Sequence, residues 1–293
     1  MRLPALPPEL RGRGKSVPHD RASVADKRRT FHKLHESGCF AIPNPWDVGS
    51  ACFLQTLGFK ALATTSSGFA WSQGHADGGM RRDQVLSHLE SMVAATDVPV
   101  NADFENGFAG DASGVADSVR LAVSTGVAGL SIEDSTGEQS RPLYEVNTAV
   151  ERIRAARRAI DEAGGDTLLV ARAECFLVGR PDLEETIARL RAYGNAGADC
   201  LYAPGLRTRD EIAAVVAGVA PKPVNVLIGS APVLSMKDLA ALGVRRVSVG
   251  GALARSAWSG FMRAARLIAQ QGRFDEFAAA ASGNELNALF KAR

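Results

Sequence analysis

Residues 145–174 read EVNTAVERIRAARRAIDEAGGDTLLVARAE and contain one complete unit of the fold. Apolar side chains recur at helical spacing from Glu145 to Ala163, and an apolar run extends from Leu168 to Ala173. The first pattern predicts an amphipathic helix, and the second predicts a strand that is buried on both faces. A helix followed by such a strand is the repeating unit of an α/β protein with a parallel sheet.

The same alternation continues along the chain in both directions. We expect eight strands, at residues 39–43, 60–65, 99–103, 129–133, 168–173, 200–203, 223–227 and 246–249. We expect helices at residues 47–57, 82–96, 113–124, 145–163, 183–196, 208–219 and 235–242, and a long helix from residue 253. Several of these helices end at a glycine, as a left-handed C-cap requires. The clearest cases are Gly58, Gly126 and Gly243.

Eight strand–helix units predict an α/β fold of the (β/α)8, or TIM barrel, class. The alternative is an open, doubly wound sheet, which is disfavoured because no glycine-rich dinucleotide fingerprint comes after the first strand. The apolar segments beyond residue 250 exceed what one barrel needs, so we also expect extra C-terminal helices.

The N-terminal part of the chain differs in charge from the rest. Residues 1–30 contain eight Lys or Arg and three acidic residues, whereas the whole chain has a net charge of +2. A segment rich in Pro, Gly and Arg buries too little apolar surface to offset its ordering entropy. We therefore expect a flexible basic arm at residues 1–25 and a barrel with C-terminal helices at residues 26–293. The arm has no interleaved aromatic residues to stack on bases, so a solvated tail is favoured over a nucleic-acid contact.

The composition excludes several classes of protein. With 46% hydrophobic and 23% charged residues, the chain lies outside the disordered and collagen-like ranges. No run approaches the roughly 18 apolar residues of a membrane helix, and the N-terminus has no apolar signal core, so we expect a cytoplasmic protein without a membrane partner. The four widely spaced cysteines predict reduced core thiols rather than a zinc site or a disulfide framework.

Polar side chains gather where the predicted strands end, which is where barrel enzymes have their active sites. Asp103 and Glu105 lie two residues apart and so point the same way, and Glu133 ends the next strand. Three carboxylates without a nearby His or Cys suit Mg²⁺ or Mn²⁺ that is partly hydrated and shared with an anionic ligand. Each acid alone is compatible with a solvated loop, but their position at adjacent strand ends favours a metal site.

Arg172 and a short Ser/Gly segment complete the candidate site. Arg172 ends an apolar strand, where an unpaired charge is costly, so it should face either an acidic side chain or an anionic substrate. The structural alternative is an ion pair with Glu174 or Glu133 inside the barrel. The segment Ser66-Ser67-Gly68 offers backbone N–H groups and hydroxyls to an oxyanion.

Taken in order, these residues carry a resemblance. They are Ser67-Gly68, Asp77, Asp103-x-Glu105-x-Gly107-Phe108, Ile132-Glu133-Asp134 and Ala171-Arg172-Ala173-Glu174. The set resembles the isocitrate lyase and phosphoenolpyruvate mutase superfamily over residues 26–270. In that superfamily a Mg²⁺ ion is held by carboxylates, largely through water. The resemblance assigns this role here to Asp77, Asp103, Glu105 and Glu133.

The resemblance also implies a substrate site and an oligomer. Members bind an α-oxo carboxylate on the metal, and the resemblance implies that Arg172 holds the carboxylate. It also implies that Ser67, Gly68 and Phe69 contact the oxygen that becomes an enolate. Asn225 matches a further polar position near the ligand. The implied catalytic residues are Ser67, Gly68, Arg172 and Glu133. Members form dimers or tetramers in which the last barrel helix is exchanged between subunits. Here an apolar stripe is consistent with that exchange and also with ordinary packing on its own barrel; it consists of Phe261, Ala264, Ala265 and Ile268.

The loop after the fourth strand departs from the superfamily pattern. Lyase members carry Lys-x-Cys-Gly-His there, whereas residues 135–144 read STGEQSRPLY and contain no Cys, Lys or His. A classical isocitrate or methylisocitrate lyase is therefore disfavoured. Mutase and phosphonopyruvate-hydrolysing members use Lys with Asn or Thr in this loop, whose only cation here is Arg141. Cys175 is a conceivable replacement acid, but a core thiol is the favoured interpretation.

The chemistry that survives these departures is metal-stabilised formation of an enolate from an α-oxo acid. We expect a Mg²⁺-dependent (or Mn²⁺-dependent) lyase or decarboxylase that cleaves a C–C bond of a small α-oxo or 2-hydroxy carboxylate, such as an oxaloacetate-like diacid. One alternative is a C–P bond mutase or hydrolase acting on phosphonopyruvate or a carboxyphosphono substrate. Another is a non-catalytic protein that binds oxo acids.

Overall fold

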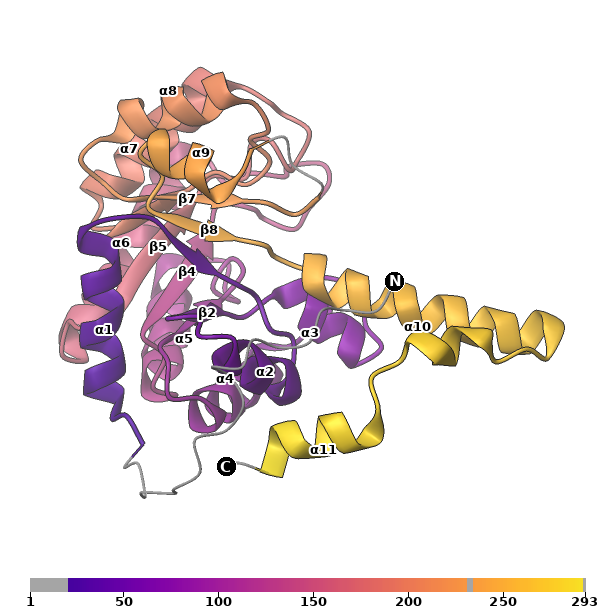
Figure 1. Ribbon diagram of the computed structural model, residues 1–293. Helices are drawn as coiled ribbons and strands as arrows, with labels where there is room; N and C mark the ends of the chain where they lie inside the picture. Colours follow the sequence, from indigo (N-terminus) through magenta and orange to yellow (C-terminus); the bar gives the residue numbers. More distant parts are fainter. Residues whose placement is uncertain (1–20, 231–233, 292–293) are drawn as a thin grey trace. The chain divides into compact units, whose positions relative to one another are not determined.

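The computed structural model describes residues 21–230 and 234–291. It divides into two compact units, of which the larger is Ser23–Arg255 and the smaller includes the chain from Ser256 onward. The larger unit contains the sheet and the surrounding helices, and the smaller contains most of the last long helix and two short helices after it (Figure 1).

The larger unit is a (β/α)8 barrel, as predicted. All eight strands are parallel, in the order β1-β8-β7-β6-β5-β4-β3-β2. The ring is closed between β2 and β1, where the backbone N–H of Ala63 donates to the Pro43 carbonyl at 3.1 Å. The strands are β1 Phe40–Ile42, β2 Leu62–Ala63, β3 Val100–Asp103, β4 Gly129–Glu133, β5 Leu168–Arg172, β6 Cys200–Tyr202, β7 Val224–Leu227 and β8 Arg246–Ser248.

A helix comes after each strand. The apolar faces of the helices after the first seven strands pack on the outside of the barrel, whereas only Ala254 of the last long helix is buried. The bounds of these helices agree with the predicted ranges to within two residues. They are α2 Val48–Thr56, α4 Arg82–Ala95, α5 Ala112–Ser124, α6 Val146–Glu162, α7 Leu183–Asn195, α8 Arg209–Val219, α9 Met236–Ala241 and α10 Ala252–Gln271.

Helix α1 (Val24–Glu36) precedes the first strand and corrects the predicted boundary of the arm, since residues 24 and 25 are helical. Residues 1–20, most of that arm, lie outside the described residues. Lys27 Nζ donates to the carbonyls of Val93 and Thr96, at the end of α4. Arg28 donates in the same way to carbonyls at the end of α5. Two charges of the basic stretch at residues 1–30 therefore cap helix C-termini, where cations are favourable.

The barrel interior is filled at its amino-terminal end by a side chain of α1. Phe31 is fully buried, and a Cβ atom added at Gly129 of β4 would lie 2.6 Å from its ring. Glycine is therefore required at position 129 for this ring to enter the barrel. The carboxyl-terminal end of the barrel is left for polar side chains.

Helix α3 (Ser66–Ser72) comes directly after the second strand, where no helix was predicted between residues 57 and 82. Thr65 is its N-cap and accepts a hydrogen bond from the backbone N–H of Gly68. The helix was not predicted because Ser and Gly are weak helix formers, whereas the cap and tertiary packing decide the conformation of such a short segment.

The smaller unit consists of the greater part of α10, the 3-10 helix Asp275–Ala279 and α11 (Gly283–Lys291). The expected extra C-terminal helices are thus present. Many of its large apolar side chains are exposed, among them Trp258, Phe261, Ile268, Phe274, Phe277, Leu286 and Phe290. No helix among the described residues is long and apolar enough to cross a membrane.

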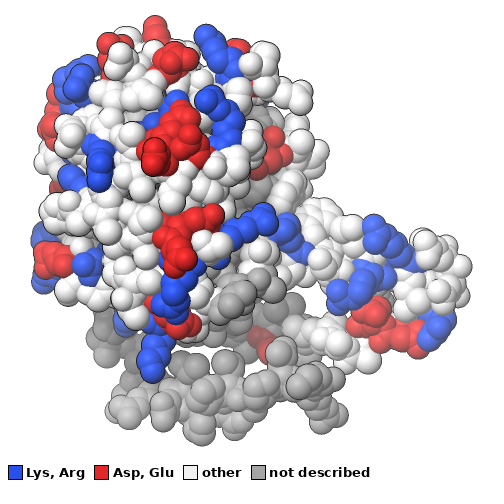
Figure 2. Space-filling view, turned by 90° about the horizontal axis from the view of Figure 1, so that it is seen from above, with Lys and Arg blue, Asp and Glu red and all other residues white. Residues whose placement is uncertain are grey.

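Acidic and basic side chains are interspersed on the face of the larger unit that Figure 2 shows, without a continuous basic area among the described residues there.

Candidate active site

A cavity of about 160 Å³ opens at the carboxyl-terminal ends of the strands, within the larger unit. It is lined by five of the residues selected from the sequence, namely Ser66, Ser67, Asp77, Asp103 and Arg172. They come from α3, the loop after α3, the end of β3 and the end of β5. Since ligand pockets for drug-sized molecules have several hundred Å³, this volume suits a small metabolite.

Arg172 lies at the centre of an ion-pair network in the wall of this cavity. Its Nη1 lies 2.7 Å from Asp103 Oδ1, its Nη2 lies 3.1 Å from Glu133 Oε2, and its Nε lies 2.9 Å from Glu174 Oε1. The predicted structural pairing with Glu174 or Glu133 is therefore confirmed for both acids, and Asp103 is added to it. Burial opposes ionisation of the guanidinium, but the three carboxylates outweigh burial and raise the pKa of Arg172.

The carboxylates around Arg172 are crowded and poorly solvated. Burial raises the pKa of Glu133 well above its ordinary value, and burial likewise raises the pKa of Glu174, with Arg172 opposing both changes. The pKa of Glu105 is raised to about 7 by burial and by the negative charges of Asp103 and Asp77. A site with this many acids favours either protons or a cation, because either one reduces the repulsion among the carboxylates.

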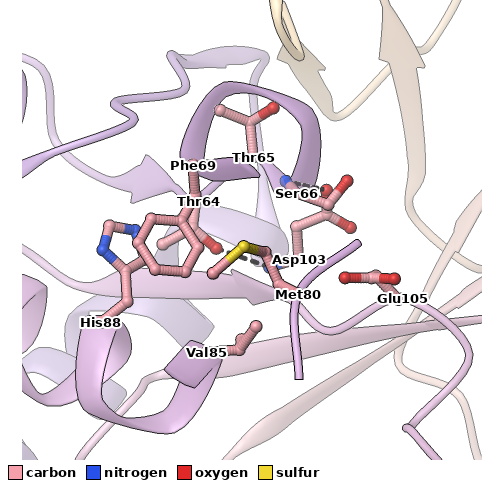
Figure 3. Close-up of a pocket in the computed structure, with 9 residues that line it drawn as sticks. All are labelled: Thr64, Thr65, Ser66, Phe69, Met80, Val85, His88, Asp103 and Glu105. Carbon is pink, nitrogen blue, oxygen red and sulfur yellow. Dashed lines mark hydrogen bonds between the residues drawn. The ribbon is translucent and has the colours of Figure 1, made fainter. Parts of the chain in front are cut away.

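Asp103 is fixed by contacts with Thr64, the residue after β2, and with Ser66, the first residue of α3 (Figure 3). The backbone N–H of Ser66 donates to Asp103 Oδ2 at 2.9 Å, and the backbone N–H of Asp103 donates to Thr64 Oγ1 at 2.8 Å. Glu105 lies beside Asp103, and its backbone has a φ of 47°, a left-handed conformation that is uncommon outside glycine. Such backbone strain occurs most often at functional sites.

Phe69 lies beside the cavity rather than in its wall. Its ring stacks on the imidazole of His88 at a centroid distance of 3.9 Å, and both border a small adjoining pocket that Thr64, Asp103 and Glu105 also line (Figure 3). The predicted contact of Phe69 with an enolate oxygen stays a prediction.

Ser67 and Gly68 lie in the first turn of α3. The Ser67 hydroxyl faces the cavity and is 3.1 Å from the Thr65 hydroxyl. The Gly68 N–H is directed at Thr65 Oγ1, and a Cβ atom at position 68 would lie 2.8 Å from the Cβ of Trp46. Packing therefore explains the glycine, and Ser67 is the better placed of the two to meet a ligand.

Asn225 is fully buried behind the cavity wall. Its side-chain oxygen accepts a hydrogen bond from Arg246 Nε at 2.9 Å, and its side-chain nitrogen donates to Ser248 Oγ at 3.0 Å. Arg246 and Ser248 both line the cavity, and the sequence analysis missed both. The alternation of side chains along a strand could have predicted both, because residues 246 and 248 must lie on the same face of β8.

No three Asp, Glu, His or Cys side chains within the described ranges are gathered closely enough to hold a metal ion directly. The predicted ligand set supplies only hard oxygen donors, which suit Mg²⁺ that keeps several of its waters. Asp103 borders both the cavity with Asp77 and the adjoining pocket with Glu105. The residues present thus fit a hydrated cation held through water, with Glu133 available across Arg172.

The loop after β4 is stabilised by contacts between its own residues. Ser135 and Leu143 form an isolated antiparallel bridge, and Arg141 pairs with Glu138 of the same loop at 3.7 Å, with both side chains mostly exposed. Cys175 is fully buried, and burial raises the pKa of its thiol. The thiol is therefore a core group, as the favoured interpretation held.

A model of the phosphoenolpyruvate phosphomutase family matches residues 31–269. The chain belongs to this family, which is part of the phosphoenolpyruvate mutase/isocitrate lyase superfamily of lyases and mutases.

Three relatives illustrate the range of reactions. A Burkholderia cenocepacia J2315 structure, provisionally named a lyase/mutase, is 49% identical with a TM-score of 0.88 and covers 92% of this chain and 96% of its own. An oxaloacetate decarboxylase of Bradyrhizobium sp. (strain ORS 278) is 30% identical over 57% of this chain and 56% of its own length. A 2-methylisocitrate lyase of Halalkalibacterium halodurans is 26% identical over 87% of this chain and 85% of its own length.

Proposed function

We propose that this protein is a Mg²⁺-dependent carbon–carbon lyase or decarboxylase that acts on a small α-oxo or 2-hydroxy diacid of the oxaloacetate type. The observation that carries the proposal is Arg172, a buried guanidinium in the wall of a small cavity, among carboxylates that fit a hydrated cation. The oxaloacetate decarboxylase relative supports the same class of substrate.

Arg172 and Ser67 have separate roles in this reaction. Arg172 provides the positive charge that binds and orients the carboxylate next to the ketone. Ser67, at the start of α3, offers its hydroxyl and backbone N–H to the ketone oxygen, where the helix N-terminus also favours negative charge. A bound divalent cation supplies further positive charge near that oxygen.

Decarboxylation then needs no acid from the loop after β4. The bond between the carbon alpha to the ketone and the distal carboxylate breaks, its electron pair moves toward the ketone oxygen to form the enolate, and carbon dioxide leaves. Water in the cavity supplies the proton that the carbon then takes. This mechanism agrees with a loop that has no Cys, Lys or His and whose Arg141 is paired with Glu138.

The C–P alternative keeps some support from the family as a whole, whose name refers to a phosphomutase. It requires a basic side chain over the substrate from the loop after β4. Arg141 is mostly exposed and paired within its own loop, which favours C–C chemistry. Turnover of phosphonopyruvate in place of any oxo diacid would reverse this preference.

We further propose that the protein forms a homo-oligomer. The larger unit has an apolar groove of about 520 Å³ over β1 and β8, between α2 and α9. It lies where the ring of helices in a (β/α)8 barrel has its eighth member. The exposed apolar stripe of α10 suits such a groove in a second copy, in line with the helix exchange that the resemblance implies.

The test of the activity combines binding and turnover. Calorimetry with oxalate, a dianion that resembles the enolate of an α-oxo acid, should show Mg²⁺-dependent binding that Arg172→Ala and Asp103→Ala abolish and that Arg180→Ala, an exposed control, leaves intact. Pyruvate should form from oxaloacetate faster than in a protein-free control with the same Mg²⁺. Absence of oxalate binding under every condition would overturn the proposal, and tight binding with no turnover of any oxo diacid or phosphonate would favour a binding protein.

A further inference from the structure

The cavity contains a second arginine, Arg246, that the proposed activity does not use. Its side chain projects into the barrel from the first residue of β8, and the residue is 2% exposed. Because Ser248 lies two residues further along β8 at the cavity mouth, Arg246 lies about 6–7 Å deeper along the strand. Asn101 has the same relation to Asp103 on β3, so Arg246 and Asn101 belong to the floor of the cavity.

The surroundings of Arg246 differ in charge from those of Arg172. Its Nε donates to Asn225 Oδ1 at 2.9 Å and its Nη1 contacts Asn101 Oδ1 at 3.3 Å, so both acceptors are neutral amides. No carboxylate of the described chain lies within ion-pair distance of it, and its Nη2 has no hydrogen-bond partner there. A buried cation without a counter-ion is costly, and a protein that retains one usually has an anion to place against it.

The neighbouring groups orient this charge toward the cavity. Asn225 is fixed in turn by Ser248, and Arg246 is held by amides on two sides, which leaves one edge of the guanidinium for a ligand. Planar guanidinium groups with a free edge are suited to carboxylates. Arg172, by contrast, already contacts three carboxylates of the chain.

We propose that Arg246 forms an anion-binding subsite at the floor of the cavity, which takes the distal carboxylate of a four- or five-carbon diacid whose oxo-acid end lies at Arg172. The inference rests on the proposed function for the position of the oxo-acid end. It adds the residue that distinguishes a diacid from a monoacid. Asn225 is then a positioning residue that acts through Arg246, which gives the buried amide a role without direct ligand contact.

A purely structural role is the competing explanation. Arg246 could only bridge β3, β7 and β8 through Asn101 and Asn225. Such a bridge would affect all ligands equally, whereas a distal subsite affects only ligands with a second anionic group. The test therefore compares ligands that differ in that group alone.

The experiment measures the affinities of malate and lactate by calorimetry at saturating Mg²⁺, because these two acids differ by the distal carboxylate. Oxalate, which engages only the Arg172 end, is measured in parallel. The variants are Arg246→Met, which removes the charge, and Arg246→Lys, which keeps it. Asn225→Asp supplies an internal counter-ion with almost no change of shape, and Arg245→Met is a matched control because that side chain contacts the Gly38 carbonyl instead.

We expect wild-type protein to prefer malate over lactate by about ten-fold or more, the value of one charge-assisted hydrogen bond. Arg246→Met and Asn225→Asp should lose this preference, Arg246→Lys should keep part of it, and Arg245→Met should keep all of it. Oxalate affinity should stay the same in every variant.

An unchanged preference in Arg246→Met and Asn225→Asp would overturn the subsite, and so would a parallel loss of oxalate affinity, which marks a structural role. If wild-type protein binds oxalate but does not distinguish malate from lactate, the subsite fails and the proposed function stands. If it binds none of the three acids, both fail. Should Arg246→Met not fold, Asn225→Asp decides the outcome. A stronger Arg246-dependent preference for phosphonopyruvate over pyruvate would overturn the assignment of a carboxylate.

Discussion

Arg172 places each of its three guanidinium nitrogens within ion-pair distance of a different carboxylate, so one positive charge serves three acids. Replacement by Lys keeps the charge but leaves one ammonium to serve three acids in fixed positions. We expect Arg172→Lys to lower kcat/KM by about 100-fold or more, since misplaced anchoring is costly in catalysis. Steady-state kinetics on the best oxo diacid measures the effect.

The same arginine also stabilises the fold. Arg172→Met leaves buried carboxylates without a partner, and breaking a buried ion pair in this way costs about 3–5 kcal/mol. Urea denaturation in EDTA should therefore show a large loss in the free energy of unfolding. Arg180→Met, which removes an exposed pair with Glu185, should cost less than about 1 kcal/mol. Similar losses in the two variants would contradict the buried network.

Glu105 makes the stability of the metal-free protein depend on pH. Its pKa rises from 4.5 to about 7 on folding, because of burial and then of Asp103 and Asp77. Between these values the folded protein binds more protons than the unfolded chain, so this contribution is present at low pH and is lost as the pH rises toward 7. In EDTA we expect Glu105→Gln to flatten the fall in Tm between pH 5 and pH 8. An equal slope in wild type and variant would show that Glu105 is not responsible.

At this scale the sequence predicted that Asp103, Glu133 and Arg172 lie at one end of the barrel and that Arg172 could pair with Glu133 or Glu174, but it did not predict the pair with Asp103. Alternation along each strand determines which side chains enter the barrel, so Asp103, Glu133 and Arg172 could be placed at one end. The barrel's stagger and the side-chain rotamers decide which atoms meet. Arg246 was not predicted because it is the first residue of β8, whereas active sites of barrel enzymes are expected at the carboxyl ends of the strands.

Among the elements, α1 provides a test of how basic residues stabilise the amino-terminal end of the barrel. Lys27 donates to two carbonyls at the end of α4, and Lys27→Met would leave these buried acceptors without a partner. We expect a loss of about 1–3 kcal/mol in the free energy of unfolding. Lys33→Met on the exposed face of the same helix is the matched control and should have little effect. Equal losses would mean that helix propensity rather than capping is being measured.

The strands and long helices were predictable because apolar runs and helical periodicity agree with what the barrel requires of them. Short elements lack enough residues to show a period. Helix α3 was missed for this reason, and its existence depends on the Thr65 cap and on the close approach of Gly68 to Trp46. Helix α1 was not predicted at all, and its first two residues were assigned to the arm, because its charged residues resemble those of the preceding arm.

For the whole molecule, the proposed oligomer predicts that an apolar stripe on α10 is buried between copies. Phe261→Glu places a charge in that stripe and should shift the protein toward the monomer, as light scattering after size exclusion would show. Gln270→Glu, half a helical turn away in projection, adds the same charge on the opposite face and should leave the assembly intact. A monomeric wild-type protein at micromolar concentration would contradict the proposal.

The sharing of Asp103 and Glu133 between Arg172 and the proposed cation site has a thermodynamic consequence. A cation that attracts Asp103 and Glu133 weakens their ion pairs with Arg172. A substrate carboxylate that binds Arg172 in turn frees Asp103 and Glu133 to interact with the cation. Each ligand must then raise the affinity of the other by the same factor. We therefore expect the apparent affinity for substrate to depend on the free concentration of Mg²⁺, so that the site would detect the two ligands in coincidence.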